Sequence, residues 1–505
     1  MKVLVVGSGG REHALVKLIR ASSIEPRVYV VMDYANPGLK REAEESRGSW
    51  FVASTTKPGN VVGIAELVNP DLIVVGPEEP QFAGVTDALR EKGFTVFGAD
   101  SDCAEIEKSK VFARSLMWKY NIPGRLFFKA FKSLDEASKF IEFAGDVVVK
   151  PARQAGGKGV KVLRDTKAYL SVDKSRVKRT YIDKLYDMMR SYSDIEYKIL
   201  VEQRVEGVEY TAQVITDGET LLPLPLAQDN PHAYEFDIGP ETGGMGSIMG
   251  PGYLLPMITE SEFKKTIEIV ESSLKALQAE KKKPYVGAIA GQMMLTGLWG
   301  PTVIEFYSRF GDPEIANLVP LLDSDFLEVL ERAATRRLAG AKIRVKDGLV
   351  SVVKAVAPSG YPDDREAATG HAVVVDERRI SELGCITLYA SVEEIDGRVY
   401  TKGSRVVEIV CSGESYREAY TKSEKAVLNV SSLDGWPLFH RSDVGSPRVI
   451  EERARLAERV RRVYLSRAAR GLLGRQLVWL PGEGVIENPL VTGVKRDRGG
   501  GVFAP

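Results

Sequence analysis

Short apolar runs alternate with amphipathic helical patterns over the first hundred residues. The segments KVLVVG (2–7), RVYVVMD (27–33) and DLIVVG (71–76) are continuous apolar runs, which are typical of buried strands. Helical patterns such as REHALVKLIRAS (11–22) lie between them. Because strands that alternate with helices build parallel sheets, residues 1–102 are expected to form an N-terminal domain with a parallel α/β sheet.

The pattern changes after residue 102. A helical stretch, AEIEKSKVFARSLMWKYN (104–121), leads to Pro123, before which a helix is expected to end. A strand, a glycine-rich loop, a second strand and a polar helical pattern then follow. We therefore expect residues 103–198 to contain a linker and a compact flap subdomain.

From residue 199 onward β-rich runs are separated by EG and DG turns, which indicates antiparallel strands. Residues 199–325 are expected to hold this sheet and one long helix, and residues 326–440 a second β-rich domain. The tail, 441–505, begins with an Arg-rich amphipathic helical pattern, RVIEERARLAERVRRVYLSRAARGLLGRQ. The predicted fold is therefore α/β and α+β multidomain, with a helical C-terminal extension.

The composition of the chain gives only a general indication of the class of protein. Apolar residues make up 44% and charged residues 27% of 505 positions, as in a soluble globular protein with a large core. The 69 basic residues balance the 69 acidic ones, so bulk charge favours neither nucleic acid nor membrane. The start, MKVLVVGSGG, is too short for a signal peptide or a membrane span, which predicts a cytoplasmic protein. Scarce Asn and Gln suggest a thermophilic host.

The three cysteines give no sign of a metal site. Cys103, Cys385 and Cys411 are far apart in the sequence, without CxxC or Cys/His spacing. An odd, sparse set also argues against a secreted disulfide framework.

Two glycine-rich segments are candidates for phosphate binding. GSGGREH (7–13) separates a strand from its helix, but Glu12 replaces the third glycine of a dinucleotide fingerprint. A tight turn that packs the helix against the strand explains the glycines of this segment equally well. KPARQAGGKGV (150–160) lies between two strands, so its loop can fold over a triphosphate. The alternative is a hairpin turn with a surface lysine, although Lys150, which ends an apolar strand, needs an anionic partner.

Two further segments carry unusual charge. QDNPHAYEFDIGPETGGMGSI (228–248) has little hydrophobic periodicity, which favours a functional loop over a surface excursion. VIEFYSRFGDPE (303–314) is an apolar strand interrupted by charge. There Glu305 suits Mg²⁺, and Arg309 suits bidentate capture of a carboxylate or phosphate. A self-neutralising set of internal salt bridges is the alternative reading.

Together these segments resemble one family. The motifs VLVVGSGGREHAL, DLIVVGPEEP, EKSKVFAR, GGKGV, GPETGGMGS and IEFYSRFGDPE occur in the order found in the glycinamide ribonucleotide synthetases, or phosphoribosylamine–glycine ligases, over residues 1 to about 460. These are ATP-grasp enzymes of purine biosynthesis. The resemblance implies a Rossmann-like domain, a two-part ATP-grasp and a C-terminal β-rich domain. It also implies that ATP and Mg²⁺ (or Mn²⁺) convert glycine to glycyl phosphate, which the amine of 5-phosphoribosylamine attacks.

The resemblance assigns roles by matching positions. Catalytic roles fall on Arg309, Asp229, Lys158 and Asp312, and metal binding on Glu305 and Gln292. Nucleotide contacts fall on Lys110, Lys150, Gly156, Gly157, Lys158, Gly159, Glu202 and Glu209. Substrate contacts fall on Gly9, Gly10, Asn36, Gly38, Gly76, Pro77, Glu78, Thr242, Gly243 and Gly244.

Departures from the family pattern gather at the same places. Tyr307 stands where the family has an Asn that supplies an oxygen to Mg²⁺, and Glu241 stands where GPNTGGMG has its Asn. QDNPH (228–232) replaces QDHKR, and Gln292 replaces a common Leu. We hypothesise that Gln292 or Glu241 supplies the missing oxygen.

Three functional readings follow. The first is a diverged glycine ligase whose partners are glycine and 5-phosphoribosylamine. The second is an ATP-grasp ligase for another carboxylate or amine, and the third a catalytically impaired nucleotide-binding paralogue. We expect a monomer or homodimer with no membrane or nucleic-acid partner. The helix of the tail is expected to pack on the C-terminal domain or a partner subunit, with Leu472, Leu473, Val478 and Trp479 on its buried side.

Overall fold

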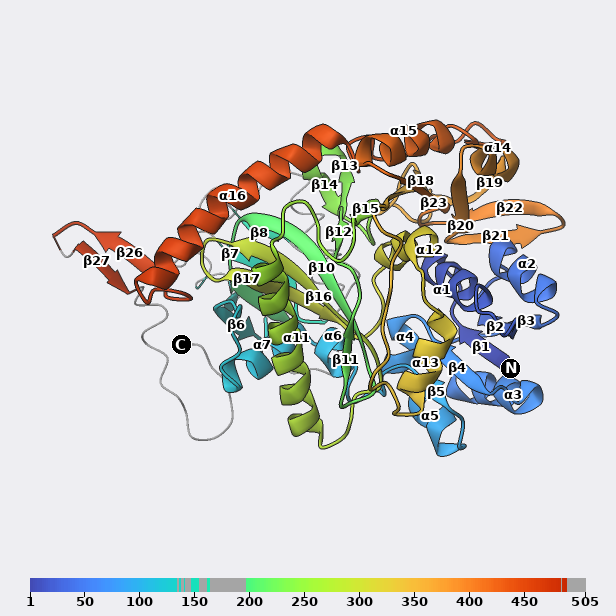
Figure 1. Ribbon diagram of the computed structural model, residues 1–505, viewed down its shortest axis with the longest axis horizontal. Coiled ribbons are helices and arrows are strands. Elements are labelled where there is room, and N and C mark those ends of the chain that lie inside the picture. The colour runs from blue at the N-terminus through green and yellow to red at the C-terminus, as the bar shows by residue number, and fades with distance from the viewer. Residues whose placement is uncertain are drawn as a thin grey trace.

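The computed structural model describes residues 1–133, 136–137, 140, 147–153, 161–163, 197–482 and 484–487 (Figure 1). Its N-terminal region is a five-stranded parallel sheet, which confirms the predicted α/β arrangement. The strands follow the order β3 (Ser49–Val52), β2 (Arg27–Met32), β1 (Lys2–Val6), β4 (Leu72–Val75) and β5 (Val96–Phe97). The connecting helices are α1 (Gly10–Arg20), α2 (Pro37–Glu45), α3 (Pro58–Val68), α4 (Glu78–Phe82) and α5 (Val85–Glu91).

A small antiparallel sheet follows the N-terminal region. Two helices, α6 (Glu105–Lys108) and α7 (Lys110–Lys119), precede it. Ser109 begins α7 because its hydroxyl accepts the N–H of Phe112 at 3.1 Å. The sheet has the order β6 (Phe128–Phe131), β9 (Ile199–Gln203), β7 (Val147–Pro151) and β8 (Lys161–Leu163).

A ten-stranded sheet forms the centre of the molecule, and all its pairings are antiparallel. It runs through β17 (Gly300–Tyr307), β16 (Gly287–Thr296), β10 (Gly207–Thr216), β12 (Ala227–Asp229), β15 (Gly246–Met249), β18 (Val350–Pro358), β23 (Val407–Gly413) and β20 (Cys385–Tyr389). Two short strands, β11 (Leu221–Pro223) and β25 (Leu438–Phe439), pair with β10 and β18. The sheet is continuous across the predicted boundary at residue 325, because β15 pairs with β18.

Helices cover this sheet and connect it to a second, smaller one. The helices are α11 (Glu260–Lys281), α12 (Leu318–Leu321), α13 (Phe326–Ala334), α14 (Glu377–Glu382) and α15 (Tyr416–Val427). The second sheet has the order β21 (Val392–Ile395), β22 (Arg398–Lys402), β19 (Thr369–Val375) and β24 (Val430–Ser432). A two-stranded ribbon, β13 (His232–Tyr234) and β14 (Ile238–Glu241), rises next to the central sheet, with a short 3-10 helix, η1 (Glu235–Asp237), at its tip. Another 3-10 helix, η2 (Glu314–Asn317), lies beneath β15 and β18.

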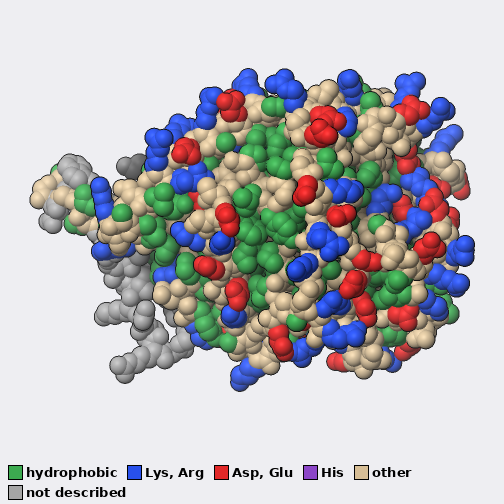
Figure 2. All heavy atoms as spheres, viewed as in Figure 1, with side chains coloured by type: hydrophobic (Ala, Val, Ile, Leu, Met, Phe, Trp, Pro, Cys, Tyr) green, Lys and Arg blue, Asp and Glu red, His purple; other side chains and the backbone are tan. Residues whose placement is uncertain are grey.

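The tail forms a helix, as expected, but its position differs from the expectation. The helix α16 (Pro447–Ala469) runs from α15 across β10, β16 and β17, so it packs on the central sheet and not only on the C-terminal domain (Figure 1). Val478 and Trp479 are not on this helix either, because they belong to β26 (Leu477–Leu480), which pairs with β27 (Gly484–Glu487). Lys and Arg side chains line the outer edge above α16 (Figure 2).

The structure also pairs two cysteines whose pairing was not predicted from the sequence. Cys385 and Cys411 are register partners on β20 and β23 and form a disulfide across the sheet. Cys103 is free and buried. Within the described residues, no helix is long and apolar enough to pass through a membrane.

Candidate active site

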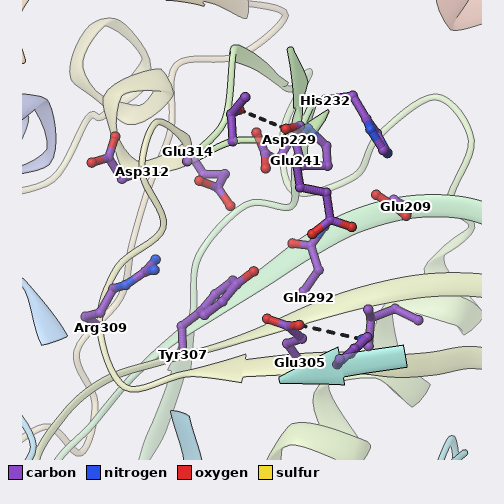
Figure 3. A pocket seen from close by; sticks show the side chains of 15 residues that line it. Glu209, Asp229, His232, Glu241, Gln292, Glu305, Tyr307, Arg309, Asp312 and Glu314 are labelled. Carbon is purple, nitrogen blue, oxygen red and sulfur yellow. Dashed lines mark hydrogen bonds and ion pairs between the residues drawn. The ribbon is translucent and has the colours of Figure 1, made fainter. Parts of the chain in front are cut away.

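The charged strand that stands out in the sequence, β17, ends inside a polar pocket. Val303 and Phe306 are buried in the core, whereas Glu305 points into the pocket (Figure 3). Val303 and Glu305 do not share a face, because the register against β16 shifts between them and interrupts the regular alternation. One oxygen of Glu305 lies 3.5 Å from Nζ of Lys110 and 3.6 Å from Nζ of Lys150. The sequence reading that Lys150 needs an anionic partner is therefore confirmed.

Glu202, on β9, lies beneath this group. Its two carboxylate oxygens bind Arg114 and Nζ of Lys150, the latter at 3.1 Å. Burial alone would raise the pKa of Glu202, but the charges of Arg114 and Lys150 outweigh it and hold the pKa at about 2. In this structure both of its oxygens bind protein cations, and its contact with a nucleotide stays a prediction.

The pocket above Glu305 has a volume of about 110 Å³. Acidic side chains outnumber cationic ones in its lining, which predisposes it to bind a cation or a cationic ligand. Figure 3 shows these side chains pointing toward one another from β17, β16, η2 and the 229–243 loop. The lining residues are Lys150, Glu209, Asp229, Pro231, His232, Glu241, Thr242, Gly243, Gln292, Ile304, Glu305, Tyr307, Arg309, Asp312 and Glu314.

Crowding of acids shifts their pKa values upward. Burial, followed by the charge of Glu305, raises the pKa of Glu241 to about 8. Burial and the neighbouring Glu314 carboxylate raise the pKa of Asp229 well above its usual value. Such shifts reflect negative charge without a sufficient counter-charge, which is common where a ligand normally binds.

Arg309 connects this pocket to the N-terminal region. Its Nε lies 3.2 Å from Glu78 at the start of α4, and its Nη2 lies 3.3 Å from Glu107. The guanidinium carbon also lies 4.3 Å from the centroid of the Tyr307 ring. Burial raises the pKa of Glu107 to about 7 despite the opposing charge of Arg309. Sequence reasoning missed Glu107, although a Glu on a buried face of α6 was a usable signal.

The loop that contains Thr242, Gly243 and Gly244 lines the opposite wall. Gly244 has φ +98°, and a Cβ there would lie 2.7 Å from Oδ1 of Asp229, so only glycine fits. Arg405 donates to the carbonyls of Gly243 and Gly244 at 2.9 and 3.1 Å.

Arg405 also lies 3.0 Å from Asp312 and 3.4 Å from Glu408. Burial alone raises the pKa of Asp312, but the charge of Arg405 lowers it to about 2. Sequence reasoning missed both Arg405 and Glu408. A charged residue within the apolar run VVEIV of β23 was the available signal.

The glycine loop at the start of α1 closes on Glu12, which explains the missing third glycine. Oε2 of Glu12 accepts the N–H of Gly9 at 2.8 Å, which is the glutamate half of a capping box. A Cβ at Gly76 would lie 2.3 Å from Oε1 of Glu12, and one at Gly10 would lie 2.7 Å from Glu408. Pro77 is the residue before α4, which brings Gly76 and Glu78 to the edge of the parallel sheet next to Arg309.

Two of the expected substrate residues have structural roles, and their contact with substrate stays a prediction. The side-chain nitrogen of Asn36 donates to the carbonyls of Ser8, Tyr389 and Ala390, and its oxygen accepts the N–H of Gly38, so this side chain fixes the loop. Gly38 packs against His13, because a Cβ there would lie 2.1 Å from Cε1 of the ring. Four further predicted residues, Gly156, Gly157, Lys158 and Gly159, lie outside the described residues.

The site residues fit a magnesium ion that is shared with a bound phosphate. Among the described residues, no three His, Cys, Asp or Glu side chains converge to hold a metal by themselves. Mg²⁺ typically binds one or two protein oxygens, with water and substrate phosphates completing its octahedron. Glu305 and Gln292 are register partners across β17 and β16 and line the same pocket, so both side chains could contribute an oxygen to such an ion.

The family comparison covers most of the chain. The sequence models of three domains match: the phosphoribosylglycinamide synthetase N domain over residues 1–107, the ATP-grasp (A) domain over 108–315 and the C domain over 351–447. A phosphoribosylamine–glycine ligase from Methanopyrus kandleri is 40% identical and covers 91% of this chain and 99% of its own length. The enzyme of the same name from Pyrococcus horikoshii is 39% identical, with 91% and 98% covered.

Solved structures agree with the sequence comparison. The crystal structure of phosphoribosylamine–glycine ligase from Thermotoga maritima has a TM-score of 0.66 and 26% identity, covering 88% of this chain and 100% of that one. The biotin carboxylase domain of 2-oxoglutarate carboxylase from Hydrogenobacter thermophilus, in complex with MgADP and bicarbonate, has a TM-score of 0.63. Its identity of 15% over 92% of this chain and 98% of that one indicates a shared fold alone.

Proposed function

We propose, since the chain belongs to the phosphoribosylglycinamide synthetase family, that it is an ATP-dependent ligase that joins glycine to 5-phosphoribosylamine. The products are glycinamide ribonucleotide, ADP and phosphate, in purine biosynthesis. Glycine is first converted to glycyl phosphate by transfer of the γ-phosphoryl group of ATP. The amine of phosphoribosylamine then attacks the acyl carbon, and phosphate leaves.

One observation carries this proposal more than any other. Arg309 lies in one pocket with the acidic acceptor loop on one side, and on the other side it pairs with Glu78 at the start of α4 in the N-terminal region. A carboxylate bound by its guanidinium would therefore lie between the nucleotide region near Lys110 and Lys150 and the edge of the parallel sheet. Ligands of open α/β sheets bind at that edge, which suits phosphoribosylamine.

The chain's own residues would stabilise charge during phosphoryl transfer. Lys110 and Lys150 lie on either side of Glu305 and are placed to neutralise nucleotide phosphates. Mg²⁺, when bound, would draw negative charge from the β- and γ-phosphate oxygens. Glu305 would hold it, with Gln292 or Glu241 as a further oxygen donor. Lys158 and its neighbouring glycines are proposed to cover the phosphates.

The structure gives the Gln292 hypothesis a specific test. Oε1 of Gln292 accepts a hydrogen bond from Oγ1 of Thr211 at 2.8 Å and retains a second lone pair. If Gln292 or Glu241 supplies an oxygen to Mg²⁺, then at least one of the variants Gln292→Leu and Glu241→Gln should raise the Mg²⁺ concentration needed for half-maximal rate. Should neither variant change that concentration, Tyr307 has been accommodated without a replacement ligand.

The deciding experiment measures phosphate release with purified protein, ATP, Mg²⁺ and freshly generated phosphoribosylamine, with and without glycine. Glycine-dependent phosphate release, together with an equal amount of glycinamide ribonucleotide, is the expected result. Release with another amino acid instead of glycine would contradict the proposed substrate. ATP binding without turnover would contradict the proposed enzyme and favour a nucleotide-binding paralogue.

Partners and location are proposed on the same basis. The small molecules glycine, ATP and 5-phosphoribosylamine are the partners that the site can bind. A monomer or homodimer in the cytoplasm of a thermophile stays our prediction.

A further inference from the structure

The β13–β14 ribbon brings two polar side chains into the pocket. His232 begins β13 and Glu241 ends β14, and both line the cavity (Figure 3). The ribbon has a register irregularity between His232 and Tyr234. Its large apolar residues are exposed, with Tyr234 at 48%, Phe236 at 61% and Ile238 at 63%, and only the small Ala233 is fully buried among the apolar residues of the two strands and their tip. A two-stranded ribbon that buries so little apolar surface has little stability of its own, so its position must be fixed from outside.

The tip of the ribbon is held in a backbone conformation that side chains disfavour. Phe236 and Asp237 both have φ +58°, in the left-handed region. Asp443 accepts the N–H of Phe236 at 2.9 Å, and the guanidinium of Arg448 lies 6.0 Å from the Phe236 ring. Residues beyond the central sheet therefore hold this conformation.

Asp237 binds two arginines from different elements. Nη2 of Arg441, a fully buried side chain, lies 2.9 Å from Oδ1 of Asp237. Nη2 of Arg453 lies 3.2 Å from Oδ2 of Asp237. Arg441 also donates to the carbonyl of His232 at 3.1 Å and binds Asp443. Arg441 and Arg453 therefore both bind the tip of the ribbon at Asp237, and Arg441 also binds its base at His232.

Arg453 reaches the acceptor loop from the tail. Its Nη1 donates to Oδ1 of Asn230 at 3.0 Å, directly after the predicted catalytic Asp229. Its helix, α16, begins at Pro447, where the match to the family's C domain ends. Arg453 and Leu456 also line a second cavity, of about 190 Å³, that shares Glu209, Asp229, Pro231 and His232 with the first.

We infer that Arg453 is a positioning residue of the acceptor site, which fixes the β13–β14 ribbon through Asp237 and Asn230 so that His232 and Glu241 face the glycine pocket. The inference rests on the proposed function for its kinetic consequence. The structural part of the inference, that α16 helps to shape the active site, does not depend on the proposed function.

The geometry explains why an arginine is needed. One guanidinium spans Asn230 and Asp237, which lie at the base and the tip of the ribbon. A lysine ammonium is a single point charge and reaches only one of them with good geometry. We therefore expect Arg453→Lys to retain part of the effect and Arg453→Gln to lose it.

The test compares Arg453→Gln with Arg455→Gln in the full chain. Arg455 is on the same helix, is 71% exposed and pairs only with Glu451 among the described side chains, so its variant controls for loss of one helix charge. We expect Arg453→Gln to raise the KM for glycine about tenfold, with an intermediate value for Arg453→Lys. The KM for phosphoribosylamine should stay within about twofold, because no hydrogen bond or ion pair among the described residues joins the ribbon to the N-terminal loops. A purely structural defect would lower kcat through loss of active enzyme without this change in KM.

Hydrogen exchange supplies a readout that needs no activity. In the ligand-free protein, Arg453→Gln and Asp237→Asn should each speed amide exchange of residues 232–242 by about tenfold, and Arg455→Gln should leave it unchanged. Unchanged exchange in the Arg453 and Asp237 variants would overturn the inference, and so would a glycine KM equal to that of Arg455→Gln. If the wild-type chain shows no glycine-dependent ligation, the proposed function fails, and the exchange data alone decide the role of Arg453.

Discussion

Glu262 is a buried carboxylate that joins the tail to the central domain. Replacing it tests whether its ion pair with α16 holds this helix on the central sheet. Its side chain is fully buried at the start of α11. It accepts hydrogen bonds from Nε and Nη2 of Arg461 at 2.9 Å each and from the Tyr464 hydroxyl at 2.8 Å. It also accepts the N–H and hydroxyl of Thr259, which completes the capping box of α11.

The expected cost of Glu262→Gln follows from these contacts. A charge-assisted hydrogen bond contributes about 1.5–3 kcal/mol, and removing one member of a buried ion pair costs about 3–5 kcal/mol. Arg461 is 17% exposed and keeps Glu458 as a partner at 2.9 Å, so the lower end applies. We expect a loss of about 3 kcal/mol. For a cooperative unit the size of the ATP-grasp match, residues 108–315, this lowers Tm by about 6–12 °C.

The assay is thermal unfolding combined with limited trypsin digestion of the Arg-rich α16. Glu268→Gln is the matched control, because Glu268 is an exposed residue on the same helix. The Glu262 variant should melt earlier and release α16 fragments faster than the control. If it melts within about 1 °C of the control, the ion pair contributes little, and α16 is held by its apolar face instead.

The contribution of Glu262 to folding stability depends on pH. Burial alone raises the pKa of Glu262, but the hydrogen bonds from Arg461, Thr259 and Tyr464 outweigh it and lower the pKa below 4.5. A carboxyl whose pKa is lower in the folded state contributes stability that is complete above its unfolded pKa. That contribution is lost as pH falls below about 4.5 through the folded pKa, and Glu262→Gln should remove this part of the acid dependence.

Three other predictions concern separate regions. Arg309→Lys should reduce the glycine-dependent rate about 100-fold in the phosphate-release assay, because an ammonium cannot bind a carboxylate bidentately; a rate within a few-fold of wild type would remove Arg309 from the reaction. Reduction of the Cys385–Cys411 disulfide, or Cys411→Ser, should destabilise the C-terminal domain by about 3 kcal/mol in denaturant unfolding, since it closes a 26-residue separation; equal curves with and without reductant would show that the bond does not form. Asn36→Ala should cost about 2–3 kcal/mol in the same assay, because it removes an α2 cap and leaves three carbonyls without their donor; a neutral effect would contradict its assigned structural role.

Much of the site could be predicted because its chemistry is local in sequence. Glu305, Arg309 and Asp312 lie within one short segment that leaves a strand, and the structure keeps them in one pocket. The protein partners of single matched positions could not be predicted in the same way. Glu202 and Asn36 lie where expected, but neighbouring protein groups saturate their polar atoms. Pairing of that kind depends on partners far away in the sequence.

The sequence by itself determined the local elements of this protein, since the periodicity of apolar residues and the turn and cap residues act over a few positions. It therefore predicted the parallel N-terminal sheet, the antiparallel strands and the Arg-rich helix of the tail. Only the tertiary structure decided that one sheet continues from β17 to β20, that Cys385 faces Cys411, and that α16 lies across the central sheet. These outcomes depend on which distant surfaces bury one another, as when Arg453 meets Asp237 from 216 residues away.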